Sequence, residues 1–63
     1  MDKLLSTREA AEVLSIKPNT LEIWRVQGKG PKFLKIGRSV KYRMERLKEY
    51  LNQHEVSSTS EYV

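Results

Sequence analysis

Residues 7–26 (TREAAEVLSIKPNTLEIWRV) place a proline between two short segments, and this arrangement limits the possible folds more than any other feature. Apolar residues recur at helical spacing on both sides of it, as Ala10, Ala11 and Leu14 before and as Leu21 and Trp24 after. Pro18 would disrupt the interior of one long helix. It suits the first turn of a new helix, where its missing N–H would have no partner. The sequence therefore predicts two helices joined by a tight turn at residues 15–17.

Further signals lie at the ends of these two helices. Ser6 and Glu9 have the spacing of a capping box, in which each side chain accepts a hydrogen bond from the backbone N–H of the other residue. Gly28 favours the left-handed conformation that ends many helices. Gly30-Pro31 then prevents continuation and starts an extended segment. The second helix is therefore expected to end before Gly28.

The segment after Pro31 has the alternation of a β-hairpin. The runs KFLKI and VKYR flank Gly37-Arg38-Ser39, and a short loop that contains glycine is typical of hairpins. A third helix is expected to follow and to end near Gln53 or His54. Its apolar stripe is formed by Met44, Leu47, Tyr50 and Leu51.

This order of elements predicts a mostly α fold with a small β-hairpin. It is the order of a winged helix-turn-helix, in which the hairpin is the wing and the third helix closes the fold. We expect one domain over residues 1–53 and a flexible polar tail over residues 54–63. A chain of 63 residues buries only about 60% of its unfolded surface, so the core must be thin.

The charged residues are distributed unevenly along the chain. No acidic residue occurs from Ile23 to Met44. Between Lys17 and Lys48 there are ten lysines and arginines but two acids, and the other acids lie near the two ends of the sequence. A basic block beside a helix-turn-helix is typical of a surface that binds the phosphates of double-stranded DNA.

The composition argues against several other classes of protein. The chain has no cysteine, which excludes disulfides and zinc sites built on cysteine. His54 is the only histidine, and the sequence contains no catalytic triad, phosphate loop or paired carboxylates, so we expect no enzyme activity, metal or cofactor. Leu4-Leu5 is too short an apolar run for a signal peptide or a membrane span. A soluble, cytoplasmic protein without a membrane partner is expected.

Taken together, the motifs resemble those of a known family. They are LSTREAAEVLSIKPNTLEIW, PKFLKIGRSVKYR and RLKEYL, within the range from Leu4 to Leu51. This pattern resembles the small MerR-like winged-helix proteins of the excisionase and AlpA type. The resemblance implies DNA binding, with a role as a recombination directionality factor or as a transcriptional regulator of a mobile element. The chain departs from the family pattern at Lys17, where relatives usually carry serine or a similar helix cap, and at Arg43-Met44-Glu45, where the last helix often starts with serine or aspartate.

The expected DNA-binding residues lie on the second helix and on the hairpin. They are Lys17, Pro18, Asn19, Thr20, Glu22, Ile23 and Arg25 on or next to the helix, and Lys35, Arg38, Ser39, Lys41 and Arg43 on the hairpin. Asparagine can pair with adenine, glutamate can accept from cytosine, and an apolar side chain can touch the thymine methyl group. The hairpin cations are expected to bind phosphates, and Arg38 at the turn is placed to enter a narrow minor groove.

Some of these residues have a second interpretation. Lys17 is either a phosphate contact or a solvated lysine at an unfavourable helix end. Ile23 either contacts a base or covers the hairpin. The hairpin cations either bind phosphates or protect a strand edge from aggregation.

The function expected from the sequence is sequence-specific binding of double-stranded DNA, by an excisionase-like factor or a small transcriptional regulator. The alternative is a protein-interaction module that binds an integrase or a transcription component. An integrase or recombinase, and further copies of the chain on DNA, are expected as additional partners. The free protein is expected to be a monomer, because no heptad repeat is long enough for a coiled coil.

Overall fold

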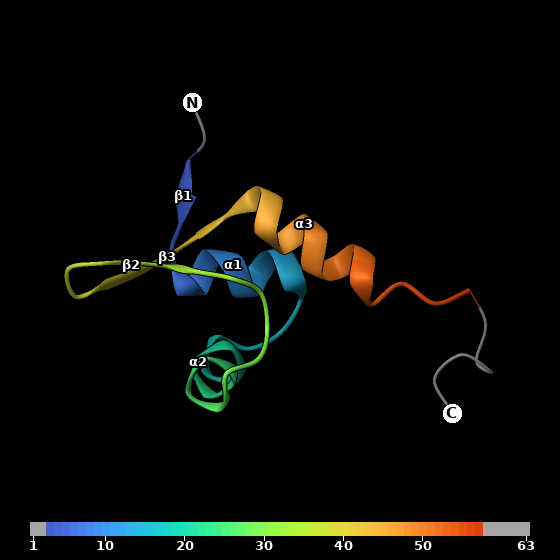
Figure 1. Ribbon diagram of the computed structural model, residues 1–63, viewed down its shortest axis with the longest axis horizontal. Coiled ribbons are helices and arrows are strands. Elements are labelled where there is room, and N and C mark those ends of the chain that lie inside the picture. Colours follow the sequence, from blue (N-terminus) through green and yellow to red (C-terminus); the bar gives the residue numbers. More distant parts are fainter. Residues whose placement is uncertain (1–2, 58–63) are drawn as a thin grey trace.

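The computed structural model of the protein describes residues 3–57. Its elements are β1 (Leu4–Leu5), α1 (Thr7–Leu14), α2 (Pro18–Gln27), β2 (Leu34–Ile36), β3 (Ser39–Arg43) and α3 (Met44–Gln53). In Figure 1, α2 lies on one side of α1 and α3 on another, while the β2–β3 hairpin projects beyond them. The predicted winged helix-turn-helix is confirmed, and β1 is an additional strand that the sequence patterns did not indicate.

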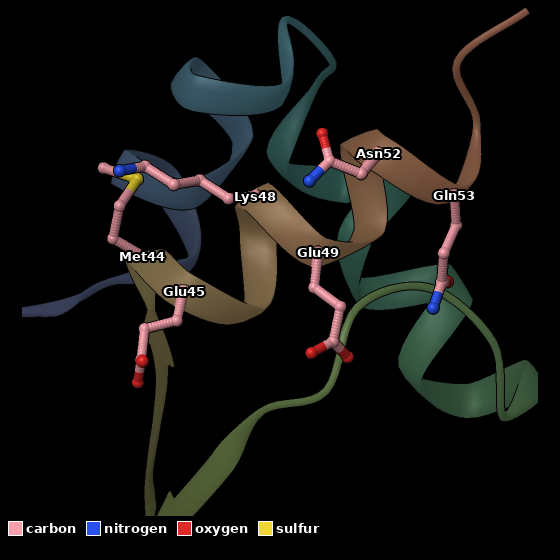
Figure 2. Close-up of a pocket in the computed structure, with 6 residues that line it drawn as sticks. All are labelled: Met44, Glu45, Lys48, Glu49, Asn52 and Gln53. Atoms are coloured by element: carbon pink, nitrogen blue, oxygen red, sulfur yellow. The ribbon is translucent and has the colours of Figure 1, made fainter.

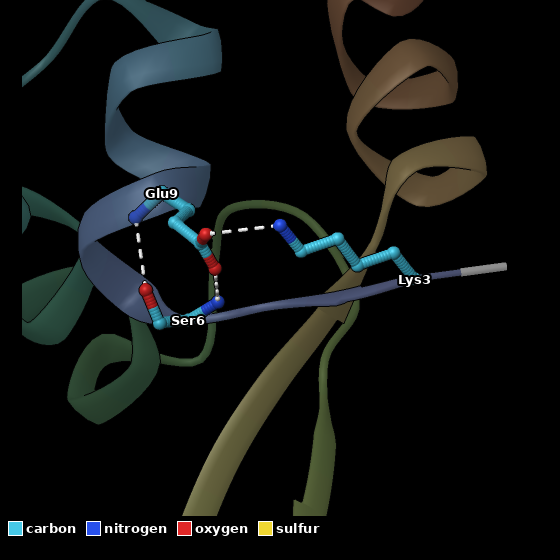
Figure 3. A network of polar contacts seen from close by, with 3 residues as sticks. All are labelled: Lys3, Ser6 and Glu9. Atoms are coloured by element: carbon cyan, nitrogen blue, oxygen red, sulfur yellow. Dashed lines mark hydrogen bonds and ion pairs between the residues drawn. The ribbon is translucent and has the colours of Figure 1, made fainter.

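The helix ends follow the predicted signals. The Ser6 N–H donates to Glu9 Oε1 at 2.9 Å, and the Glu9 N–H donates to Ser6 Oγ at 3.1 Å, which completes the capping box (Figure 3). Gly28 ends α2 in the left-handed conformation, with φ of 72°. Ser15 adopts the same conformation at the end of α1, with φ of 58°, although a non-glycine residue rarely does so. This sharp turn directs the chain from α1 into α2.

The three strands form one antiparallel sheet in the order β1-β3-β2. Leu5 pairs with Tyr42 across β1 and β3, which fixes the start of α1 against the hairpin. Ile36 pairs with Ser39, so the hairpin loop is only Gly37-Arg38 and Ser39 belongs to β3 rather than to the predicted loop. The positive φ of Gly37, 61°, matches a tight turn with glycine at its first central position.

The core lies where α1, α2, α3 and the sheet meet. Its buried side chains are Leu5, Ala10, Ala11, Leu21, Tyr42 and Leu47, and Leu14, Ile16, Trp24 and Val40 pack against them. Ala10 and Ala11 are 0% and 1% exposed, and their small side chains allow neighbouring elements to come close to α1. No helix within residues 3–57 is long and apolar enough to cross a membrane.

The predicted apolar stripe of α3 is only partly buried. Leu47 is fully buried and Tyr50 is half-buried, whereas Met44 and Leu51 are 36% and 43% exposed. The packed face of α3 is centred between Leu47 and Tyr50, so Met44 and Leu51 lie at its edge. Helix α3 ends at Gln53, and residues 54–57 after it are exposed, while the flexible tail over residues 54–63 stays a prediction. The rest of that predicted tail, residues 58–63, lies outside the described residues.

Glu9 connects the N-terminal segment to α1. Besides the capping box, its Oε2 atom lies 3.6 Å from Lys3 Nζ (Figure 3). The backbone hydrogen bond from Ser6 lowers the pKa of the Glu9 carboxyl from its ordinary value of 4.5, and the positive charge of Lys3 lowers it further. Ionised Glu9 therefore stabilises the folded state.

The first prediction concerns the pH dependence of stability. A carboxyl whose pKa is lower in the folded state stabilises the fold above its unfolded pKa, near 4.5, and loses this effect as the pH falls through the lower folded value. Glu9→Gln keeps a capping side chain but removes the charge. The stability difference between wild type and Glu9→Gln, measured by urea denaturation, should be largest at neutral pH and should shrink below pH about 4.5. A difference that does not change with pH would contradict this role.

Candidate nucleic-acid interface

The exposed side of α2 is set by the residues that anchor its opposite side. Leu21 is 1% exposed and Trp24 packs against the core. Asn19, Glu22 and Ile23 therefore lie on the solvent side, as expected for residues that are three and four positions apart. Ile23 is 45% exposed, and its base contact stays a prediction. Thr20 is half-buried at the border between the two sides.

Val26 continues this exposed surface and is not among the residues predicted from the sequence to bind DNA. It is 89% exposed and lies seven positions after Asn19, on the same face of α2. Its spacing from Asn19 could have indicated it. We call Asn19, Glu22, Ile23 and Val26 the α2 stripe.

The start of α2 is exposed and has no side-chain cap. Lys17 occupies the cap position in an extended conformation, and its side chain makes no capping hydrogen bond. Its backbone carbonyl accepts a hydrogen bond from the Thr20 N–H at 3.0 Å. Pro18 follows as the first helical residue and is also exposed. The ammonium group of Lys17 is thus presented to solvent beside the first turn of α2.

Trp24 fixes α2 against the rest of the fold. Its ring lies 5.7 Å from that of Tyr50 in α3, measured between centroids. A Cβ added to Gly30 would lie 2.9 Å from Trp24 Cε3, and Gly30 has φ of 92°, so the chain that leaves α2 passes directly over the indole. Glycine is therefore required here by both space and backbone conformation.

Arg25 is held by contacts within the protein. Its Nη1 atom donates to the Tyr42 hydroxyl at 3.0 Å and to Thr7 Oγ1 at 3.2 Å. Its guanidinium carbon also lies 5.8 Å from the centre of the Phe33 ring. Arg25 thus joins α2 to α1 and β3. Its expected DNA contact would have to use the other edge of the guanidinium.

The pairing of β2 with β3 divides the hairpin residues between two faces. Val40 and Tyr42 face the core, and Lys35 pairs with Val40 and shares that face. Ser39, Lys41 and Arg43 alternate with them and share the opposite face. Arg38 lies in the turn and is exposed. The structure therefore brings Ser39, Lys41 and Arg43 together and places Lys35 apart from them.

Two small hollows, one beside the end of α2 and one beside the hairpin, have only basic residues among their charged lining residues. We call the two linings together the basic surface. One lies between the end of α2 and β2, and its charged lining residues are Arg25, Lys29 and Lys32. The other has Lys32, Arg43 and Arg46 as its charged lining residues, beside Phe33. Arg46 is also paired with Glu49 at 3.0 Å. Lys29, Lys32 and Arg46 were not among the predicted site residues, although the first two belong to the acid-free segment.

A third, shallow groove runs along the exposed side of α3 (Figure 2). Its lining residues are Met44, Glu45, Lys48, Glu49, Asn52 and Gln53. The acids and the lysine together give this groove a mixed charge, unlike the basic surface. His54 lies just beyond it, with Nδ1 2.9 Å from the Tyr50 carbonyl oxygen. No group of three or more potential metal ligands from His, Cys, Asp and Glu occurs among residues 3–57.

The amino-acid sequence matches a known family over most of its length. Residues 4–55 match the family described as helix-turn-helix domain. The matched range begins with β1 and includes all of α3, so it covers every element of the structure. No curated protein sequence matches the chain.

The second prediction concerns the hydrogen bond between Arg25 and Tyr42. Tyr42→Phe removes a hydrogen bond to a charged group and should cost about 1.5–3 kcal/mol of stability. Arg25→Ala should cost at least as much, because it leaves the buried Tyr42 hydroxyl without this partner and removes the contact with Phe33. In a domain of this size, 1 kcal/mol lowers Tm by about 4–8 °C.

The double variant tests whether the two residues interact as described. Its loss of Tm should be clearly smaller than the sum of the two single losses, since each single change removes the same hydrogen bond. Additive losses would show that Arg25 and Tyr42 stabilise the fold independently.

Proposed function

The chain belongs to the helix-turn-helix domain family of excisionase-like and AlpA-like proteins, and we propose on this basis that it binds double-stranded DNA in a sequence-specific manner in the cytoplasm. In this proposal α2 enters the major groove and the β2–β3 hairpin contacts phosphates beside it. The proposal includes no chemical step, metal or cofactor.

One observation supports this proposal more than the others. The α2 stripe is exposed, and the segment from Ile23 to Met44, which begins within the stripe, carries many cations and no acid. A helix whose outward side carries an amide and apolar groups can contact base edges, while cations around it bind the phosphates. Glu22 is the exception on this side, and cytosine N4 is the donor that it would accept from.

The biological role that we propose is that of an excisionase-like recombination directionality factor or a small transcriptional regulator of a mobile element. One copy of so small a domain contacts few base pairs. Useful specificity therefore requires several copies on repeated sites, or a dimer on an inverted repeat. Neighbouring genes for an integrase would favour the first role, and a regulated operon would favour the second.

The shallow groove on α3 favours a second function, binding of a protein partner. Met44 and Leu51 are partly exposed apolar residues of α3, and Met44 lines the groove. An integrase or a transcription component would be the partner.

Salt dependence separates the two functions. Binding to duplex DNA should weaken steeply as salt is raised, because phosphate contacts release counterions. Selection of duplexes from a random pool, followed by titration at several salt concentrations, is the direct experiment. Absence of salt-sensitive binding to any duplex would contradict the DNA-binding proposal and leave the protein-interaction function.

The third prediction concerns the outer face of the hairpin. Lys41→Ala combined with Arg43→Ala should weaken binding to selected and random duplexes alike. The slope of log K against log salt should fall by about two, since each phosphate contact contributes about 0.9. Lys48→Ala, on the α3 groove, is the matched control and should leave the slope unchanged. An unchanged slope in the double variant would show that both cations are only solvated.

The fourth prediction concerns the oligomeric state. The apolar residues that pack in this fold form a single core, so the free protein should sediment as one chain at micromolar concentration. A stable dimer without DNA would contradict this prediction and would favour a palindromic site.

A further inference from the structure

The α2 stripe contains two apolar side chains that face away from the core. Ile23 is 45% exposed and Val26 is 89% exposed. They are three positions apart and lie on the side opposite Leu21, which is buried. The exposed parts of these two side chains do not contribute to the packing of this small domain, in which apolar residues are scarce.

The charges around α2 suggest what this surface contacts. Lys17 precedes the helix and Lys29 follows it, and both are exposed. Ten helical residues extend about 15 Å, and the major groove of B-DNA is about 12 Å wide. A helix with a cation at each end can therefore place both cations near phosphates at the edges of the groove, while the residues between them face the base pairs.

We propose that Ile23 and Val26 contact the C5-methyl groups of thymines, so that α2 recognises A·T pairs through apolar contacts as far as its last turn. The inference rests on the proposed DNA-binding function. The thymine methyl group is the apolar group that base pairs present in the major groove, so it is the specific partner for an apolar side chain there.

The geometry of α2 limits where these thymines lie. Asn19 and Val26 are separated by seven residues, which is about 10 Å along the helix axis. This distance corresponds to about three base-pair steps of roughly 3.4 Å each. The contacts of the α2 stripe therefore span about three base-pair steps, which is about four base pairs, and the Val26 contact lies at the end of that span farthest from the Asn19 contact.

The test removes single methyl groups from the DNA. A duplex selected from a random pool is compared with copies in which one thymine at a time is replaced by deoxyuridine, which pairs identically but lacks the methyl group. Wild type should bind about fourfold more weakly for each contacted methyl that is removed, as expected for the loss of one buried apolar carbon. These positions should be close together in the site.

Protein variants then assign each methyl group to a side chain. Ile23→Ala and Val26→Ala should each bind the selected duplex several-fold more weakly, and each should lose the thymine preference at one position. Val26 is 89% exposed, so Val26→Ala should melt at the wild-type temperature, whereas Ile23→Ala, at a 45% exposed position, should melt slightly lower and remain folded. Val13→Ala is the matched control, because Val13 is a 36% exposed valine on α1, and it should keep every thymine preference.

The outcomes distinguish this inference from the proposed function. If wild type binds the selected duplex in a salt-sensitive manner but tolerates every deoxyuridine, or if the two variants keep the full thymine preference, the methyl contact is overturned and DNA binding stands. A selected site without a required thymine would have the same meaning. If wild type binds no duplex, the DNA-binding proposal itself fails.

Discussion

The arrangement of this fold depends on a buried tyrosine hydroxyl. Tyr42 is 0% exposed, and burying a hydroxyl without a partner costs about 1–3 kcal/mol. Arg25 supplies that partner at 3.0 Å and also donates to Thr7. One guanidinium therefore holds α2 to the start of α1 and to the central strand of the sheet. Together with the packing of Leu21 and Trp24, this hydrogen bond sets the relative orientation of the helix and the hairpin, and so the distance between the two proposed DNA contacts.

The same constraint explains how so few buried residues keep the elements in place. The core contains two alanines, and its largest fully buried side chains are Tyr42, Leu21 and Leu47. Each of these comes from a different element, β3, α2 or α3. Leu5 adds β1 to the same core and pairs with Tyr42 in the sheet. A thin core is sufficient here because every element except β2 contributes a side chain to one meeting point. Polar contacts such as that between Arg25 and Tyr42 then hold the elements in their relative orientation.

Local signals predicted the helices and the hairpin, whereas long-range contacts were not accessible from the sequence. The capping box, Pro18 and Gly28 act within one turn of the chain, so the bounds of α1 and α2 followed from them. β1 has only two residues, and its pairing with β3 joins segments far apart in the sequence.

The exposed face of α2 followed from Leu21 and Trp24. The contacts of Arg25 did not, because a basic residue in a basic segment gives no sign of a buried partner. The separation of Lys35 from Lys41 and Arg43 could be known only from the strand register. A shift of the register by one residue would move the side chains of a strand to the opposite face of the sheet.

The position of Trp24 has an optical consequence. It is the only tryptophan of the chain, and it lies against Tyr50, whose ring is 4.2 Å from that of His54. Its indole is thus placed between α2 and α3, on the side of α2 opposite the stripe. The intrinsic fluorescence of the protein therefore reports on the docking of α3 rather than on events at the exposed face of α2. A change in emission on adding a ligand would mean that the surroundings of Trp24 change, at its contact with Tyr50 or at the segment around Gly30 that passes over the indole, even if the ligand binds elsewhere.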